Sequence, residues 1–162
     1  MSDRSLSATE VLLEVSTRGK GTLMVCDRPV RLATRHATCA LLWLCTAAEK
    51  RLAVDELAPA LWPTAAESRL GRRLATMTWQ IRRGLEEAAH LVERTPEALR
   101  IDAAGVRVNV LEARFAAQQA LANGRPVPEW AVEELSAEHC TPFAEMAWVV
   151  ELNAVNAELL AR

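Results

Sequence analysis

The sequence predicts an α+β fold in which a domain of short strands and helices is followed by a short all-α extension. Runs that alternate apolar and polar residues, the pattern of half-buried strands, occur over residues 10–32 and 90–102. Between and after these runs, apolar residues recur every three or four positions, which is typical of amphipathic helices. The helical period takes over near Arg107, so we expect one domain over residues 1–107 and a helical extension over residues 108–162.

The first elements expected along the chain are two or three short antiparallel strands. They lie in "EVLLEVSTRGKGTLMVCDRPVRL", whose "RGKG" and "DRP" segments have the composition of tight turns. A helix follows in "TRHATCALLWLCTAAEK", with Thr34 placed to cap its N-terminus. The residues expected to share its buried face are Ala37, Leu41, Leu44 and Ala48.

A second, shorter helix is expected in "VDELAPALWP", where Asp55 is placed as the N-cap. Pro59 lies inside this segment and removes a backbone donor, so the helix is short or bent, and Pro63 ends it. Its buried face consists of Leu57, Ala58 and Leu61. We interpret Trp62 as a structural plug at the helix end and Trp43, in the preceding helix, as a core residue.

The clearest helix of the chain spans about residues 64–85 and is strongly basic. Its apolar stripe runs through Leu70, Leu74, Met77, Ile81 and Leu85. A different face carries Arg72, Thr76, Trp79 and Arg83, and it is flanked by Arg69, Arg73 and Gln80. With Arg82, the helix holds five arginines against a single acid, Glu67. Such a run is often only a solvated face, but here little acid is available to pair with it, which favours contact with a polyanion.

A hairpin is expected next, in "HLVERTPEALRID", with "TPEA" as its turn. Beyond it, three helices are expected in residues 108–124, 127–139 and 141–162. The order of strands, helix, short helix, long basic helix and hairpin is that of a winged helix-turn-helix domain. In DNA-binding domains of this kind, the second helix of the helix-turn-helix pair enters the major groove.

Charge is divided along the same boundary. The whole chain is slightly acidic, with 19 basic and 21 acidic residues. Residues 1–114 carry 17 basic and 14 acidic side chains, whereas residues 115–162 carry 2 and 7. An acidic tail therefore masks a basic first domain.

Several other classes of function are disfavoured. The cysteines form no Cys-x-x-Cys pair and no histidine stands at metal-ligand spacing from them, so no metal site is expected. The carboxylates are unclustered, the histidines lack a Ser or Cys partner at a recognised spacing, and no Gly-rich phosphate loop is present, so we expect neither an enzyme nor a cofactor. The polar start "MSDRSLSATE" is unlike a signal peptide, and no apolar stretch is long enough to span a membrane. We expect a soluble, cytoplasmic protein with reduced cysteines and no membrane partner.

Several segments together carry a family resemblance: "RPVRLATRHATCALLWL", "VDELAPALWP", "LGRRLATMTWQIRRGL" and "LVERTPEALRID", followed by "VNVLEARF" and "TPFAEMAWVVELNAVNAELLA". In this order the chain resembles the OmpR-like winged-helix family, and within it the SARP-type branch, which joins that domain to a bacterial transcriptional activation domain. The third segment is similar to the recognition helix, with a Leu-Arg-Arg-x-Leu-like ending, and the fourth stands where the wing belongs. The last two resemble the start of the activation domain.

The chain also departs from the family pattern. Its wing has Ala98-Leu99 where Gly-Tyr usually closes the hairpin, and Asn109 stands where an Asp is usual. The activation domain of similar proteins continues through several more helices, so the chain is either a fragment or a short, free-standing relative.

The resemblance implies a sequence-specific DNA-binding transcription regulator with the helix at about 64–85 in the major groove. The residues implied to contact DNA are Arg69, Arg72, Arg73, Thr76, Trp79, Gln80, Arg82, Arg83, Arg94 and Arg100. Similar proteins bind double-stranded DNA as head-to-tail pairs on direct repeats and recruit polymerase, so a homodimer and RNA polymerase are the further partners implied.

Some features leave alternatives open. Trp79 either contacts DNA or a partner, or it folds over the helix end or under the wing. Arg94, Thr95 and Arg100 either follow the phosphate backbone or only keep the hairpin soluble. The helices that carry Trp130, Phe143 and Trp148 are expected to form an amphipathic pair packed on the domain. The alternative function is a winged-helix protein–protein interaction module without DNA binding, which uses Trp79 and these acidic helices.

Overall fold

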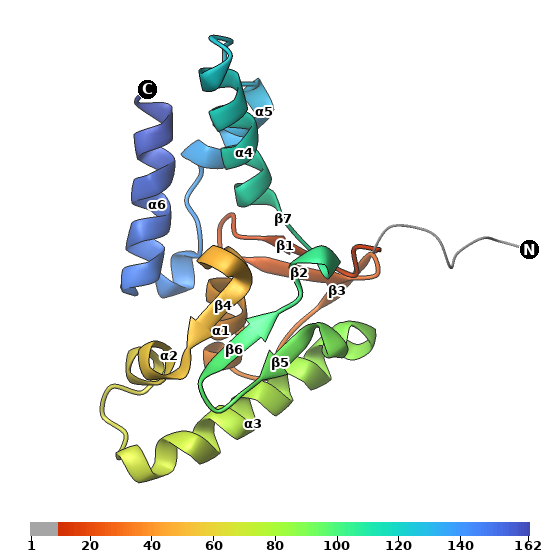
Figure 1. Ribbon diagram of the computed structural model, residues 1–162, viewed down its shortest axis with the longest axis vertical. Coiled ribbons are helices and arrows are strands. Elements are labelled where there is room, and N and C mark those ends of the chain that lie inside the picture. Colours follow the sequence, from red (N-terminus) through yellow and green to blue (C-terminus); the bar gives the residue numbers. More distant parts are fainter. Residues whose placement is uncertain (1–9) are drawn as a thin grey trace, which may run out of the picture.

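The computed structural model describes residues 10–162 and has the α+β fold expected from the sequence, with two small sheets and several helices (Figure 1). One sheet has the strand order β3-β2-β1-β7 and contains β1 (Leu13–Ser16), β2 (Thr22–Val25), β3 (Arg28–Val30) and β7 (Val106–Val108). The first three strands are antiparallel, as expected, and β7 pairs in parallel with β1. That parallel strand was not expected from the sequence.

The second sheet contains the expected hairpin. Its strands are β5 (Val92–Arg94) and β6 (Ala98–Ile101), and the turn between them is closed by hydrogen bonds between Thr95 and Ala98. A third strand, β4 (Arg51–Ala53), pairs with the other edge of β6 and was not expected.

Helix α1 (Arg35–Thr46) begins as the sequence predicted. The side chain of Thr34 accepts a hydrogen bond from the backbone N–H of Ala37 at 3.2 Å, which caps the first turn. The helix ends at Thr46, so Ala48 lies beyond it and is exposed. Its assignment to the buried face was therefore wrong.

Helix α2 (Val54–Leu61) begins two residues earlier than expected. Ala53 is the N-cap residue, and Asp55 lies inside the first turn, so its assignment as the cap was wrong. The reason is that β4 runs directly into the helix, and the N–H of Val54 is bonded to the carbonyl oxygen of Glu97 in the hairpin turn. Trp62 follows the helix and is buried, which fits its interpretation as a plug.

Helix α3 (Glu67–Leu85) starts later than residue 64, because residues 62–66 form the turn of the helix-turn-helix pair, with the N–H of Ala65 bonded to the carbonyl of Trp62. Its apolar stripe packs inward on the core. Leu74, Met77, Ile81 and Leu85 are buried, and Leu70 is half-buried. A 3-10 segment (Glu86–Leu91) then leads into β5.

The extension consists of α4 (Asn109–Ala122), α5 (Glu129–Ser136) and α6 (Ala147–Leu160). Arg114 ties α4 to α6, because its guanidinium donates to the side-chain oxygen of Asn156 at 2.7 Å and to the carbonyl of Leu152 at 2.9 Å. In Figure 1, α5 and the far end of α4 lie at the opposite end of the molecule from α3.

Two aromatic residues of the chain after β7 pack on side chains of α1. The Trp148 ring stacks on that of Trp43 in α1, with 6.1 Å between centroids, and Phe143 is buried under the guanidinium of Arg35. Trp130 is 52% exposed, so the expectation that it is also packed was wrong. The buried face of α5 consists of Ala131, Glu134 and Leu135, and Trp130 points about 100° away from it.

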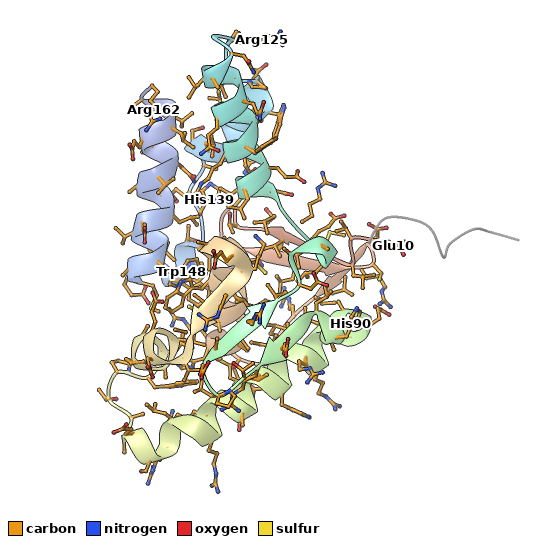
Figure 2. The ribbon with its side chains drawn as sticks, viewed as in Figure 1. Glu10, His90, Arg125, His139, Trp148 and Arg162 are labelled. Carbon is orange, nitrogen blue, oxygen red and sulfur yellow. The ribbon has the colours of Figure 1, made fainter. Side chains whose placement is uncertain are left out.

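The docking also uses a buried polar contact. His139 lies between the extension and the first sheet (Figure 2), where its Nδ1 is 2.7 Å from the hydroxyl of Thr17. Arg35 pairs with Glu145 at 2.9 Å on the outside of the same junction. No helix within residues 10–162 has both the length and the apolar character needed to cross a membrane.

Candidate nucleic-acid interface

The basic surface of α3 is fully presented to solvent. Its arginines, Arg69, Arg72, Arg73, Arg82 and Arg83, are all exposed. None of them forms an ion pair with any residue in the described range 10–162. Because unpaired guanidinium groups keep all their donors available, this surface is suited to bind carboxylates or phosphates.

The side of α3 opposite the buried stripe carries the residues that point straight away from the protein. Arg72, Thr76, Trp79 and Arg83 are all exposed there, separated by three or four residues along the helix. This row was expected from the sequence, and the structure leaves it uncovered along the described chain. In helix-turn-helix domains that bind DNA, the outward side of the second helix is the side that enters the major groove.

The flank of α3 that faces α1 and α2 forms a hollow. Arg69 and Arg73 line it together with Trp62 and His36, whose rings stack with centroids 5.6 Å apart. Gln80 lies on the same flank but is half-buried, and its side-chain oxygen accepts a hydrogen bond from the Thr34 hydroxyl at 2.9 Å. Gln80 therefore links α3 to the start of α1. This bond uses the side-chain oxygen of Gln80 and leaves its amide nitrogen available to donate to another group.

The other flank of α3 faces the hairpin, and here the structure separates the two wing arginines. Arg94 is opposite Leu99 in the strand register and lines a hollow with Trp79, Arg82 and Arg83. Arg100 is opposite Glu93 instead, and therefore lies on the other face of the hairpin. The structure thus brings Arg94 to the basic surface and places Arg100 away from it.

Trp79 and Arg83 form a pair one helical turn apart. The guanidinium carbon of Arg83 lies 5.2 Å from the centroid of the Trp79 ring, within the range of a cation–π interaction. The ring is nevertheless 59% exposed. Of the two interpretations open from the sequence, the structure therefore favours a ring that is available for contact over a ring folded into the protein.

Arg28 has a role that the sequence did not reveal. Two acids follow the basic helix, and Arg28 of β3 pairs with both of them, Glu86 at 3.2 Å and Glu87 more closely. This contact draws the acidic side chains toward β3 and away from the basic row of α3. No local pattern signals it, because Arg28 is 58 residues from Glu86 along the chain.

Groups suited to metal binding or covalent chemistry do not gather near this surface. Within residues 10–162, no three His, Cys, Asp or Glu side chains are close enough to hold a metal ion. Burial raises the pKa of Cys45 to about 12 and that of Cys140 to about 12, so both are neutral thiols. Cys26 is the exposed thiol among the described residues.

Comparison with known proteins supports the fold. Neither protein-family models nor curated proteins give a match. A solved structure, Mycobacterium tuberculosis EmbR in complex with low affinity phosphopeptide, aligns with a TM-score of 0.68 and 19% sequence identity. The chain therefore has a winged-helix fold that resembles the one in this structure.

The extent of this match is unequal in the two proteins. It covers 94% of this chain but 44% of the EmbR chain, so the chain spans less than half of the length of EmbR. EmbR is a transcription regulator of the SARP family. At this identity the likeness establishes the shared fold, which includes both the helix-turn-helix region and the helical extension.

Proposed function

We propose that this chain is a sequence-specific DNA-binding transcription regulator in which α3 enters the major groove. The observation that carries the proposal is that all five arginines of α3 are exposed and form no ion pair within the described residues, on the second helix of the helix-turn-helix pair. The likeness to EmbR, a transcription regulator, supports the same function. We further propose that the protein is non-enzymatic and cytoplasmic.

The arrangement of α3 assigns different tasks to its arginines. Arg72 lies in the N-terminal half and points outward, where a guanidinium can donate two hydrogen bonds to guanine. Arg82 lies on the flank shared with Arg94 of the hairpin, where contact with a phosphate strand is favoured. Arg69 and Arg73 flank the groove on the opposite side, beside the helix-turn-helix turn.

The remaining members of the predicted site are proposed with smaller or altered roles. Thr76 is exposed beside Arg72 and is placed to contact a base edge. Gln80 is primarily a positioning residue, because its oxygen is bonded to Thr34. Arg100 contacts DNA only if the hairpin presents its outer face, so we propose that it contributes least to DNA binding. A homodimer and RNA polymerase stay as proposed partners.

One observation favours a second candidate, a winged-helix module that binds proteins and not DNA. Trp79 exposes a large apolar surface, and exposed aromatic residues are common in protein interfaces. The surrounding arginines argue for a polyanion, and for this reason we place DNA binding first.

The two candidates are separated by a binding titration. A labelled random-sequence duplex of about 30 base pairs is titrated with the protein by fluorescence anisotropy, from about 0.05 to 0.2 M salt. We expect the protein to bind the duplex at low salt. The logarithm of the binding constant should fall linearly with the logarithm of the salt concentration, because phosphate contacts release counterions. The absence of binding at micromolar protein at low salt would contradict DNA binding and favour the protein-interaction module.

A further inference from the structure

Trp79 is an apolar side chain in the middle of a basic row. Its ring is 59% exposed, and it stands on α3 between Arg72 and Arg83, on the side that faces away from the core. Exposed tryptophan on a helix contributes nothing to the core and leaves a large apolar surface in water. Unlike the exposed Trp130, it stands among arginines without ion pairs, and this setting suits contact with a molecule outside the described chain.

The neighbours of the Trp79 ring restrict what that contact can be. The guanidinium of Arg83 lies over the ring, and Arg82 and Arg94 line the same hollow. A purely apolar protein surface would have to desolvate three guanidinium groups as it approached the ring, which costs free energy unless acids pair with them. A ligand that matches this surface therefore has an anionic group and an apolar group within a few ångströms of each other.

Duplex DNA meets both requirements in its major groove. The groove is bordered by phosphates, and the 5-methyl group of thymine is the apolar group that projects into it. Stacking of a whole base on Trp79 would instead require a base that has left the helix, as in single strands. A ring held on a regular helix, with Arg83 fixed above it, is suited to an edge contact inside the groove of a paired duplex.

Resting on the proposed function, we propose that Trp79 is a specificity-determining residue that packs against a thymine methyl group in the major groove. Arg83 is held by the ring and directed to the phosphate strand beside that base. The pair thus joins an apolar contact, which selects thymine, to an ionic contact, which supplies affinity.

The test replaces thymine by uracil, which removes only the methyl group. A preferred duplex is first selected from a random pool with the full chain, and each thymine of the site is then replaced singly by uracil. We expect one or two positions at which uracil weakens binding of the unchanged protein by about three- to fourfold, as for loss of one buried methyl group. In Trp79→Ala those same replacements have no further effect, whereas Trp130→Ala, at an exposed tryptophan of the extension, retains the full effect.

The outcomes distinguish this inference from the function on which it rests. If the chain selects and binds a duplex but no uracil replacement weakens it, or the weakening persists in Trp79→Ala, the inference is overturned and DNA binding stands. Tighter binding of the single strand than of the duplex, lost in Trp79→Ala, also overturns it. If no duplex is bound at all, the proposed function and the inference fall together. Trp79→Phe, which keeps an aromatic ring, is expected to retain part of the methyl effect.

Discussion

At the scale of single residues, His139 is held in its neutral form where the extension meets the first sheet. Its Nε2 lies 2.7 Å from the carbonyl oxygen of Glu134, which can only accept, so Nε2 carries the proton and Nδ1 accepts from the Thr17 hydroxyl. Burial lowers the pKa of His139 below its ordinary value.

This histidine predicts a loss of stability in mild acid. Because its pKa is lower in the folded than in the unfolded chain, the unfolded chain takes up the proton first as the pH falls below about 6.5. We therefore expect the free energy of unfolding to decrease as the pH is lowered from about 7.5 to about 5.5. The substitution His139→Gln should remove the part of this decrease that is due to His139. Urea unfolding at both pH values measures it, with His90→Gln, at an exposed histidine, as the control.

Glu134, which lies in the same junction, has the opposite effect on the pH dependence of stability. Burial raises the pKa of Glu134, which favours its neutral form in the folded chain. The contribution of Glu134 to the free energy of unfolding therefore grows as the pH falls. Because Glu134 is present in both proteins, the difference between the wild type and His139→Gln isolates the histidine. An identical pH dependence in the two would contradict the assigned role of His139.

The arginines of α3 are predicted to differ in what they read. Arg72→Ala should weaken binding to the preferred duplex by about 1–3 kcal/mol and relax the preference at one base position. Arg82→Ala should weaken binding about equally on all sequences and reduce the salt slope by about one. Titration of each variant against preferred and random duplexes over a salt series makes the comparison. Equal behaviour of the two variants would contradict the division between groove and phosphate strand.

At the scale of elements, the docking of α6 on α1 depends on Trp148. Its ring is buried against Trp43, and both rings are nearly parallel, at 3°. Trp148→Ala is expected to reduce the free energy of unfolding by about 3–5 kcal/mol, because it leaves a large cavity beside α1. Chemical denaturation measures the loss. Trp130→Ala removes an exposed ring and is expected to change stability by less than about 0.5 kcal/mol; similar losses in both would show that α6 is not docked there.

The helices and the hairpin were predictable because each has a local signal. The apolar stripe of α3 and the Thr34 cap of α1 are visible within a few residues of sequence. The strands β4 and β7 have no such signal, because each is three residues long and its partner is distant, as in the pairing of Leu13 with Val106. The start of α2 was misplaced for the same reason, since a bond to Glu97 in the hairpin turn fixes it.

The candidate site was predictable to a similar degree. The outward row of α3 follows from helical periodicity alone. The difference between Arg94 and Arg100 does not, because it depends on the strand register of the hairpin. The bond from Thr34 to Gln80 joins residues 46 positions apart, and no local pattern encodes it.

At the scale of the whole molecule, the division at residue 107 remains a prediction, and the boundary lies inside β7, which pairs with β1. The acidic extension is arranged so that α5 and the far end of α4 lie at the other end from α3 (Figure 1). The acids on these two helices are therefore distant from α3, and at physiological salt the field of such exposed charges is screened within about 8 Å.

This arrangement predicts an electrostatic effect confined to low salt. The substitution of Gln for Glu129, Glu133, Glu138 and Glu151, all exposed, changes the formal net charge from −2 to +2. We expect this variant to bind duplex more tightly than the wild type at about 0.02 M salt and equally at about 0.15 M. Anisotropy titrations at both salt concentrations measure it. Tighter binding that persists at the higher salt would show that these acids lie close to bound DNA.

The central claim, that α3 is the DNA-binding surface, is tested most directly by reversing one charge at each end of the molecule. Arg72→Glu alters the outward row of α3, and Arg125→Glu alters an exposed arginine at the opposite end (Figure 2), with the same change in net charge. The measurement is the affinity of each full-length variant for one duplex at one salt concentration. The predicted result is a loss of about tenfold or more for Arg72→Glu and of less than about twofold for Arg125→Glu. Equal losses in both, or none in Arg72→Glu, would contradict the claim.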